Sequence, residues 1–431
     1  MRKVLLILLI GQILAYGAES LSLEDCLNLA RTKNPDLRIG EKQIQYAKEG
    51  IRDSYSTILP SVGFEYSATK SIMGAGKRFY QGAYIPTPDT STNNFSTGLS
   101  LNQNLYEGGK RRNQIKLAKG KVQGSQLDLN RTQQSIVENV TEKFYTVLQA
   151  KELLKVYEMT QKNSQEQLKK TEEMFKIGQV AKKDLFKAQV SEGESRLYVI
   201  KQKSILKNAL NDLKVAIGVS PDYVLDAYEE SYIKPVVIDK AVAEQKALEN
   251  NPEMKSLLVE KSNSYLNYKI ARGALLPSVD GSFTYGRDGS KISRTYWPFD
   301  EYWNSSINLT ISYPLFTGFG RKANIQQKKI DFNQYDDQID KKKLEIASDI
   351  ESLILTINTN IEMIEINEIN ILSAQEDLRL AQEMYRLNSA TLLDVLDAQV
   401  ALTKAQGDLV TTKYDAKIAE VRLAYLMGTL K

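Results

Sequence analysis

The sequence has no histidine among its 431 residues and only one cysteine. The absence of histidine excludes a histidine general base, a Ser-His or Cys-His nucleophile and an imidazole metal ligand. A single cysteine allows no disulfide within the chain and no thiolate cluster. No convergent set of polar residues replaces these groups, so we expect no enzyme activity, no cofactor and no metal site.

A strong charge of one sign and a long apolar run are also missing. Lys and Arg number 57 against 53 Asp and Glu, a formal net charge of +4, which gives no reason to expect a nucleic-acid partner. After the N-terminus no stretch of about 18 consecutive apolar residues predicts a membrane-spanning helix. If the chain enters a membrane, it must do so as a β-barrel, because only a barrel satisfies the backbone of strands in lipid.

The N-terminus has the pattern of a secretory signal peptide. Arg2 and Lys3 precede an apolar run from Val4 to Leu14, and small residues follow. We therefore expect residues 1–17 to be removed, with cleavage after Gly17 or Ala18. The run is too short for a membrane anchor. Charged residues precede Cys26, so we expect this cysteine to be a buried residue of the first helix rather than a lipidation site.

Proline is scarce and unevenly placed. The ten prolines leave residues 89–220 and 315–431 free of it. Because proline breaks helix interiors, two such tracts predict long helices.

The sequence contains an internal repeat. Two motifs recur 217 residues apart: Asn34-Pro35-Asp36-Leu37 with Asn251-Pro252-Glu253-Met254, and Leu59-Pro60-Ser61-Val62 with Leu276-Pro277-Ser278-Val279. Later matches recur 210 residues apart, among them Asp184-Leu185 with Asp394-Val395 and Gly218 with Gly428. We interpret the chain as a tandem repeat, with copies at 21–218 and 241–431 joined by a linker at 219–240.

Each copy has the same predicted layout. Short helices surround the Asn-Pro motif, at 22–33 and 36–58 in the first copy. The first copy continues with a strand pair at 61–106, a long helix at 110–176 and a return helix at 182–217. In the second copy the corresponding elements are a strand pair at 278–316, a long helix at 320–387 and a return helix at 391–428.

The strand pairs alternate apolar and polar residues. Ile307, Leu309 and Ile311 share one face, and Asn308 and Thr310 the other. Within each pair we expect a long loop rich in Gly, Pro and Asn, which includes residues 74–94 in the first copy and 288–298 in the second. An aromatic-rich soluble sheet and membrane strands with an aromatic girdle both fit this pattern, and the export signal favours the membrane.

The long helices carry apolar residues seven apart. Ile115, Val122, Leu129 and Ile136 have counterparts 210 residues later at Ile325, Phe332, Ile339 and Ile346. This spacing predicts coiled-coil packing. A 67-residue helix would be about 100 Å long, so it needs partners of equal length, which two shorter helices stacked end to end provide. Four strands cannot close a barrel, so the chain must assemble into eight, twelve or sixteen strands.

These features together resemble the TolC family of outer-membrane efflux and secretion channels. The resemblance rests on Leu21-Ser22-Leu23-Glu24-Asp25-Cys26-Leu27, the repeated Asn-Pro and Leu-Pro-Ser motifs, the segment at 315–321 and the segment at 391–398. It implies a mixed α+β membrane protein in which three chains form a twelve-stranded β-barrel, continued by a long periplasmic α-helical barrel. It also implies a homotrimer in the outer membrane of a Gram-negative bacterium, in contact with outer-membrane lipid, a periplasmic adaptor and an inner-membrane transporter of the RND, ABC or MFS type.

The turns between long and return helices carry the candidate functional residues. Gly178 and Asn388 occupy matching positions and favour the left-handed conformation that ends a helix. Asp394 and Asp397 lie three residues apart on one helix face. Alone, such a pair is usually a solvated surface. In a threefold assembly it would place six carboxylates around an aperture, where like charges would bind cations and have raised pKa values.

The resemblance also implies a lock that closes the channel. Tyr385 matches the family's tyrosine and Asp184 its acidic acceptor, whereas Ala390 stands where the family has an arginine. We expect a passive exit duct driven by a partner pump and gated at these turns. The alternative is a secreted structural coiled coil or adhesin whose strands form a soluble cap.

Overall fold

The structure is a computed structural model that describes residues 19–228, 234–236, 238–298, 300–387 and 389–430. The predicted signal peptide and Asn388 lie outside the described residues. The chain divides into two compact units. Unit 1 comprises residues 1–41, 128–255 and 341–431, and unit 2 comprises residues 42–127 and 256–340. Each unit takes segments from both halves of the chain.

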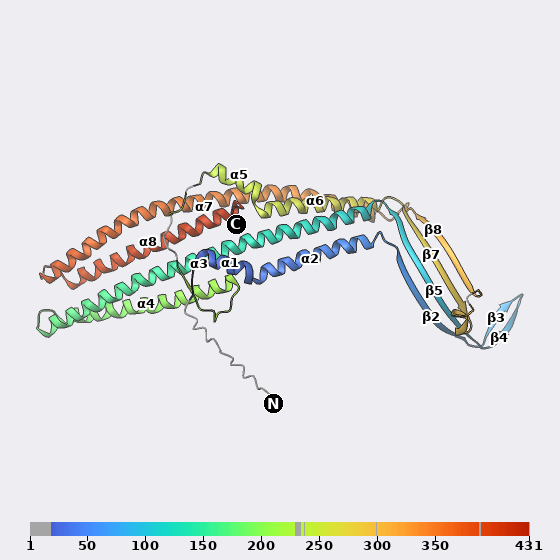
Figure 1. Ribbon diagram of the computed structural model, residues 1–431, viewed down its shortest axis with the longest axis horizontal. Helices are drawn as coiled ribbons and strands as arrows, with labels where there is room; N and C mark the ends of the chain where they lie inside the picture. The colour runs from blue at the N-terminus through green and yellow to red at the C-terminus, as the bar shows by residue number, and fades with distance from the viewer. Residues whose placement is uncertain (1–18, 229–233, 237, 299, 388, 431) are drawn as a thin grey trace, which may run out of the picture. The chain divides into compact units, whose positions relative to one another are not determined.

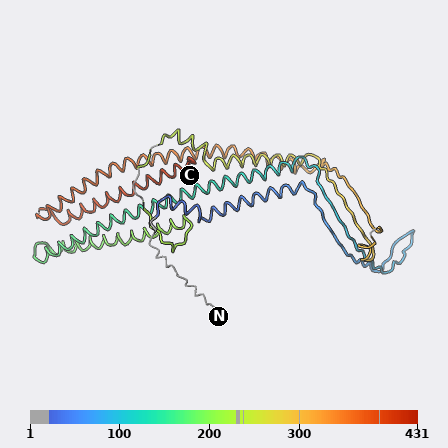
Figure 2. The backbone as a smooth tube through the Cα atoms, viewed as in Figure 1, coloured from blue at the N-terminus to red at the C-terminus, as the bar shows by residue number. Residues whose placement is uncertain are grey.

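The two halves have the same order of helices (Figures 1 and 2). The first half contains β1 (Glu19–Leu21), α1 (Leu23–Lys33), α2 (Pro35–Ser56), β2 (Ser61–Met73), β3 (Gly76–Tyr80), β4 (Ala83–Thr87), β5 (Thr90–Glu107), α3 (Lys110–Lys176) and α4 (Lys182–Ile217). The second contains β6 (Leu225–Ala227), α5 (Lys240–Asn250), α6 (Pro252–Gly273), β7 (Ser278–Gly289), the 3₁₀ helix η1 (Ile292–Thr295), β8 (Trp303–Ser312), α7 (Gly320–Arg386) and α8 (Leu392–Leu426). Helices α1 and α5 both have 11 residues, α2 and α6 both have 22, and α3 and α7 both have 67.

The strands differ from the prediction at their outer ends. Most of the expected first loop is strand: β2 extends to Met73, β5 begins at Thr90, and residues 76–87 form the β3–β4 hairpin. In the second copy β7 extends to Gly289. The loop prediction was wrong because cross-strand hydrogen bonding outweighs the low strand propensity of Gly and Asn. Strand β8 ends at Ser312, short of the predicted 316, because Pro314 has no N–H to donate.

The four long strands of unit 2 form one antiparallel sheet in the order β2-β5-β7-β8. The register aligns apolar residues across all four strands, and one such row is Val62, Leu101, Phe283 and Ile307. The adjacent row is polar and consists of Ser61, Asn102, Ser282 and Asn308. Residues directly opposite each other share a face of the sheet, so one face is apolar and the other polar.

Apolar residues at heptad spacing line the long helices α3 and α7, each of which contributes residues to both units. Ile136, Ile339 and Ile346 are buried as the heptad predicts, and the other members of the predicted seam are partly buried. In α7 the buried series continues through Ile350, Ile357 and Ile364. Helix α4 returns along the second part of α3 and α8 along α7, as Figure 1 shows. Among the described residues, no helix is both long enough and apolar enough to cross a membrane.

The Asn-Pro motif joins two helix ends in each half. Asn34 accepts a hydrogen bond from Asp36 N (2.8 Å) and donates from its amide to the Ala216 carbonyl at the end of α4 (3.0 Å). Asn251 accepts from Glu253 N (2.9 Å) and donates to the Leu426 carbonyl at the end of α8 (3.0 Å). Each asparagine caps the helix that its proline begins and satisfies a terminal carbonyl of another.

The predicted linker at 219–240 contains β6, which pairs in parallel with β1. Lys151 of α3 forms an ion pair with Asp226 of β6 at 2.7 Å. Cys26 is fully buried, as predicted, and burial together with the nearby Asp25 raises the pKa of its thiol to about 12. The thiol therefore stays protonated and unreactive.

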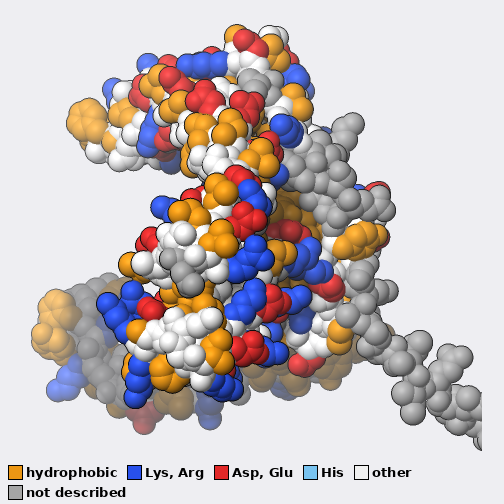
Figure 3. Space-filling view, turned by 90° about the vertical axis from the view of Figure 1, so that its left-hand side faces the viewer, with side chains coloured by type: hydrophobic (Ala, Val, Ile, Leu, Met, Phe, Trp, Pro, Cys, Tyr) orange, Lys and Arg blue, Asp and Glu red, His pale blue; other side chains and the backbone are white. Residues whose placement is uncertain are grey.

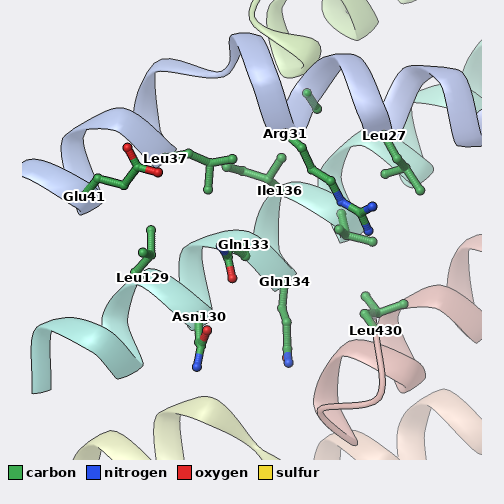
Figure 4. A pocket seen from close by; sticks show the side chains of 12 residues that line it. Leu27, Arg31, Leu37, Glu41, Leu129, Asn130, Gln133, Gln134, Ile136 and Leu430 are labelled. Carbon is green, nitrogen blue, oxygen red and sulfur yellow. The ribbon is translucent and has the colours of Figure 1, made fainter. Parts of the chain in front are cut away.

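A cavity remains where α1 and α2 pack on α3. It has a volume of about 360 Å³, and Leu27, Leu37, Leu129 and Leu430 line it together with Gln134 (Figure 4). The lining mixes aliphatic and amide side chains from three helices and the C-terminal segment. We assign it no function.

Candidate gate at the helix turns

The α3–α4 turn is closed by a glycine in the left-handed conformation. Gly178 has φ = 77°, and Gln179 N donates to the Met174 carbonyl at 2.9 Å. This bond, together with Gly178 N donating to Phe175 O at 3.0 Å, is the pattern that commonly ends helices at glycine. The structure thus places Gly178 in a helix-ending turn.

The α7–α8 turn has the matching hydrogen bond. Ser389 N donates to the Met384 carbonyl at 2.8 Å, 210 residues after the corresponding bond in the first turn. Figure 3 looks onto the side of the molecule where both turns lie, and Lys, Arg, Asp and Glu side chains are intermixed there. Among the described residues, side chains of both signs therefore occur on this side of the protomer.

Asp394 caps its own helix. Its carboxylate accepts hydrogen bonds from Thr391 N (2.7 Å) and the Thr391 hydroxyl (2.8 Å), and Asp394 N donates back to that hydroxyl at 3.4 Å. This reciprocal pair is a capping box at the start of α8. The bonds from the backbone and side chain of Thr391 lower the pKa of Asp394. In the protomer, hydrogen bonds to the charged form dominate the pKa of Asp394. The rise expected from six clustered carboxylates concerns the threefold assembly and stays a prediction.

Asp397 lies one turn further along the same exposed side of α8. Leu392, Val395 and Ala398 on the opposite side are buried, the last two in a cluster with Leu378 and Ala381 of α7. The apolar side of α8 thus packs on α7 and leaves both carboxylates exposed. The first-copy turn lacks this arrangement, since Ala181 precedes α4 without a side-chain cap.

Tyr385 lies where α7 meets the first helix pair. It packs against the Leu378 cluster, and its hydroxyl is buried without a hydrogen-bond partner of good geometry among the described residues. Burial raises the pKa of this hydroxyl, the adjacent Thr171 hydroxyl lowers it, and the nearby Asp184 carboxylate raises it. The structure brings together Tyr385 and Asp184, and adds Thr171, which the sequence interpretation did not include.

Polar side chains continue this contact along α3 and α8. The buried Gln399 amide donates to Thr160 O (3.2 Å) and to the Ser164 hydroxyl (3.1 Å), and the Thr160 and Thr403 hydroxyls lie 3.0 Å apart. The heptad pattern of apolar residues gives no sign of this contact. The Thr-x-x-Asp spacing at 391–394, in contrast, is a capping signature that could have been read from the sequence.

A groove lies beside this polar contact, between α3, α4 and α8. It has a volume of about 470 Å³ and is lined partly by small side chains, including Ser191, Ser195 and Gly407. Tyr157 and Tyr198 stack in its wall with ring centroids 5.6 Å apart.

A family model described as outer membrane efflux protein matches this chain twice, at residues 26–219 and 243–429. The chain belongs to the outer membrane efflux protein family. The protein is thus an outer-membrane export component, and the secreted coiled-coil or adhesin alternative is disfavoured. The family resemblance stated from the sequence is confirmed.

Two relatives show how far the likeness extends. Outer membrane protein TolC of Salmonella enteritidis is 24% identical over 440 residues, which covers 99% of this chain and 87% of the relative. Proteases secretion protein PrtF of Dickeya chrysanthemi is 22% identical over 441 residues, which covers 100% of this chain and 93% of the relative. The outer membrane efflux family likeness therefore extends over the whole chain.

A solved structure shows the same fold. The Campylobacter jejuni CmeC outer membrane channel superposes with a TM-score of 0.80 at 19% identity, and the match covers 94% of this chain and 85% of that one. At this identity the match supports the fold alone. The efflux family member described here thus has an outer membrane channel fold, mostly helical with a four-stranded sheet.

Proposed function

We propose that this protein is the outer-membrane exit duct of a tripartite efflux pump or a type I secretion system. It conducts substrates passively from an inner-membrane transporter to the exterior and is gated at the α3–α4 and α7–α8 turns. The observation that carries the proposal is the sheet of unit 2. One of its faces is apolar and exposed, and the outer edges of its two edge strands, β2 and β8, pair with no other strand among the described residues.

The apolar face would be costly in water. Val62 is 71% exposed, Phe64 69%, Ile307 84% and Leu309 64%. Soluble proteins rarely expose a contiguous apolar surface of this kind. In a bilayer the apolar face would contact lipid instead of water, which removes this unfavourable exposure. The polar rows on the opposite face would then line an aqueous lumen.

The edges of the sheet define the assembly. Strands β2 and β8 are the two edges, and open edges in lipid would leave backbone groups unpaired. Because the sheet has an even number of strands, β8 of one copy can pair antiparallel with β2 of the next. We propose a homotrimer with a twelve-stranded barrel and a periplasmic α-helical barrel. The double family match and the equal helix lengths support the tandem repeat within each copy.

We assign the gate to the residues around the turns. Three copies would bring Asp394 and Asp397 into a ring of six carboxylates at the aperture. Tyr385, facing Thr171 and Asp184, would hold the second helix pair against the first in the closed state. Ala390 removes one potential contact of this lock. Opening would be a movement of α7 and α8 past α3 and α4 between two packings of one coiled coil.

The groove between α3, α4 and α8 gives the periplasmic adaptor a place to bind. Its small side chains let a helical hairpin approach closely. Relatives named for efflux and for protease secretion leave two classes of cargo to be distinguished. Deletion of the gene should either sensitise cells to small toxic compounds or abolish the export of a protein. The first result would indicate an efflux pump and the second a type I secretion system.

The proposal as a whole is tested by fractionation and gel mobility. The protein should co-sediment with outer membranes and migrate as a trimer until it is heated. Recovery as a monomer in the soluble periplasmic fraction would contradict the duct function.

A further inference from the structure

The strand-to-helix junctions of unit 2 combine positive charge with exposed apolar side chains. The long helices begin there with Lys110, Arg111 and Arg112 in α3, and with Arg321 and Lys322 directly after Gly320 in α7. We call these residues, together with segment 313–319, the junction site. All of them belong to unit 2.

The charges at these helix starts oppose the helix dipole. The first turns of α1, α2, α4, α6 and α8 contain acidic residues, as the positive N-terminal end of a helix favours. The first turns of α3, α5 and α7 contain none. Helix α5 begins with the single Lys240, which pairs with Glu351, and Asp239 caps it, whereas α3 and α7 begin with several basic residues. Glu107 forms ion pairs with Lys110 (2.6 Å) and Arg111 (3.2 Å), so one carboxylate partners two of the five cationic side chains.

Three of the cations have no acidic partner among the described residues. Arg112 and Lys322 are exposed, and Arg321 donates to the Ala274 carbonyl at the end of α6. Arg321 and Lys110 line a cavity of about 720 Å³ together with Ile270, Leu276 and Tyr313. Glu107, which pairs with Lys110, also lines this cavity, so Arg321 is the cation that the cavity presents beside its apolar wall.

The adjoining segment exposes large apolar residues. Leu315 is 89% exposed, Phe316 75% and Phe319 66%. The Phe316 and Phe319 rings pack edge to face at 5.5 Å, and Lys322 Nζ lies 5.9 Å from the centre of the Phe319 ring. Phe319 has φ = 65°, an unfavourable backbone conformation for a bulky residue, and its side chain is exposed all the same.

We propose that the junction site binds an anionic phospholipid. Arg112, Arg321 and Lys322 bind the phosphate headgroup, and Tyr313, Phe316 and Phe319 contact the acyl chains. A free phosphate ion would satisfy the cations but leave the apolar residues in water, so the chemistry favours a lipid. This inference rests on the outer-membrane placement of the proposed duct and names the lipid class that the chain contacts there.

Native mass spectrometry of the full-length protein tests the site. We expect phosphatidylglycerol to bind more tightly than phosphatidylcholine with the same acyl chains. The double variant Arg112→Gln, Lys322→Gln should lose about tenfold or more in phosphatidylglycerol affinity, with phosphatidylcholine binding unchanged. Both side chains are exposed, and within the described ranges they make no hydrogen bond or ion pair that folding would need.

Matched variants separate the headgroup from the acyl contacts. Lys169→Gln with Lys170→Gln removes two exposed charges elsewhere on α3 and should change nothing. Phe316→Ala should lower the binding affinity for phosphatidylglycerol and for phosphatidylcholine by the same factor. Equal affinity for the two lipids, equal loss in the control, or displacement of phosphatidylglycerol by inorganic phosphate would overturn the proposal. If such a protein still fractionates with outer membranes as a trimer, the duct function stands and only the lipid site fails.

Discussion

The Asp394 carboxylate stabilises the start of α8 in the protomer, before any assembly forms. Two hydrogen bonds from Thr391 hold it in place and keep its pKa below the ordinary value. A carboxylate fixed in this way stays charged in acid, when an unrestrained carboxylate would be protonated. The same contacts that cap the helix would therefore keep a negative charge at the proposed aperture.

Asp394→Asn should weaken the fold at neutral pH but not in strong acid. Because the folded-state pKa lies below the ordinary 3.8, the charged carboxylate stabilises the fold above that pH, and its contribution disappears as the pH falls through the lower folded-state value. Thermal unfolding followed across this range should show a smaller loss of stability in acid for the variant than for the wild type. Asp397→Asn, which leaves the capping box intact, is the control. Identical acid profiles for wild type and Asp394→Asn would show that the cap contributes nothing.

Tyr385→Phe should raise the leak conductance of the channel in planar bilayers. The hydroxyl makes no hydrogen bond of good geometry with the part of the chain that the structure describes, so its removal should leave the thermal midpoint nearly unchanged. In the closed assembly it would face Thr171 and Asp184, and its loss should weaken the closed state alone. Thr171→Val should act in the same direction. An unchanged leak in both variants would remove Tyr385 from the lock.

At the level of elements, three glycines in or beside α4 differ in backbone conformation and in the space around them. Gly218 ends α4 with φ = 87°, and a Cβ there would lie 2.8 Å from the Asn34 Cα. Gly178 has φ = 77° with nothing within 4 Å, and Gly193 lies within α4 with nothing within 4 Å. The same Gly→Ala substitution at these three positions therefore meets different backbone strain and different steric contact.

Alanine at these glycines should give a graded series in thermal unfolding followed by helical signal. Gly193→Ala should stabilise by about 0.5–1 kcal/mol through helix propensity. Gly178→Ala should cost about 1–2 kcal/mol for the left-handed backbone. Gly218→Ala should cost about 3 kcal/mol or more, since the clash with the Asn-Pro corner adds to the same strain. Equal effects at 178 and 218 would show that the corner yields and that the close packing is unimportant.

The sequence predicts the helices more closely than the rest because their signals are local. The proline-free tracts and the heptads at Ile136 and Ile346 gave α3 and α7 to within a residue of their ends. The β3–β4 hairpin was missed because strand pairing depends on a partner that composition does not show. The contact of Gln399 with Thr160 and Ser164 was missed because a polar contact between helices far apart in sequence leaves no periodic pattern. Asp184 and Tyr385 were paired only through the family resemblance.

At the level of the whole molecule, the proposed acidic ring would form only in the assembly. The double variant Asp394→Ala, Asp397→Ala should weaken block by multivalent cations in planar-bilayer conductance, because a ring of carboxylates binds such ions. Asp397→Asn alone should produce part of this effect without disturbing the helix cap. Unchanged block in both variants would show that the constriction lies elsewhere.

Closure of the sheet between copies is testable with engineered cysteines, because the native Cys26 is buried and will not react. Ser306 of β8 and Glu65, Ser67 and Thr69 of β2 lie on the polar face of the two edge strands. We combine Ser306→Cys in turn with Glu65→Cys, Ser67→Cys or Thr69→Cys. The pair that lies directly opposite across the contact between two copies should form disulfide-linked oligomers up to a trimer, and it identifies the strand register there. Ser306→Cys with Ser100→Cys is the control, since β5 has both of its neighbours within the same chain and should give no link between copies. If no β2 position cross-links to Ser306→Cys while the protein is still recovered from outer membranes, the edges do not meet and the twelve-stranded closure is wrong.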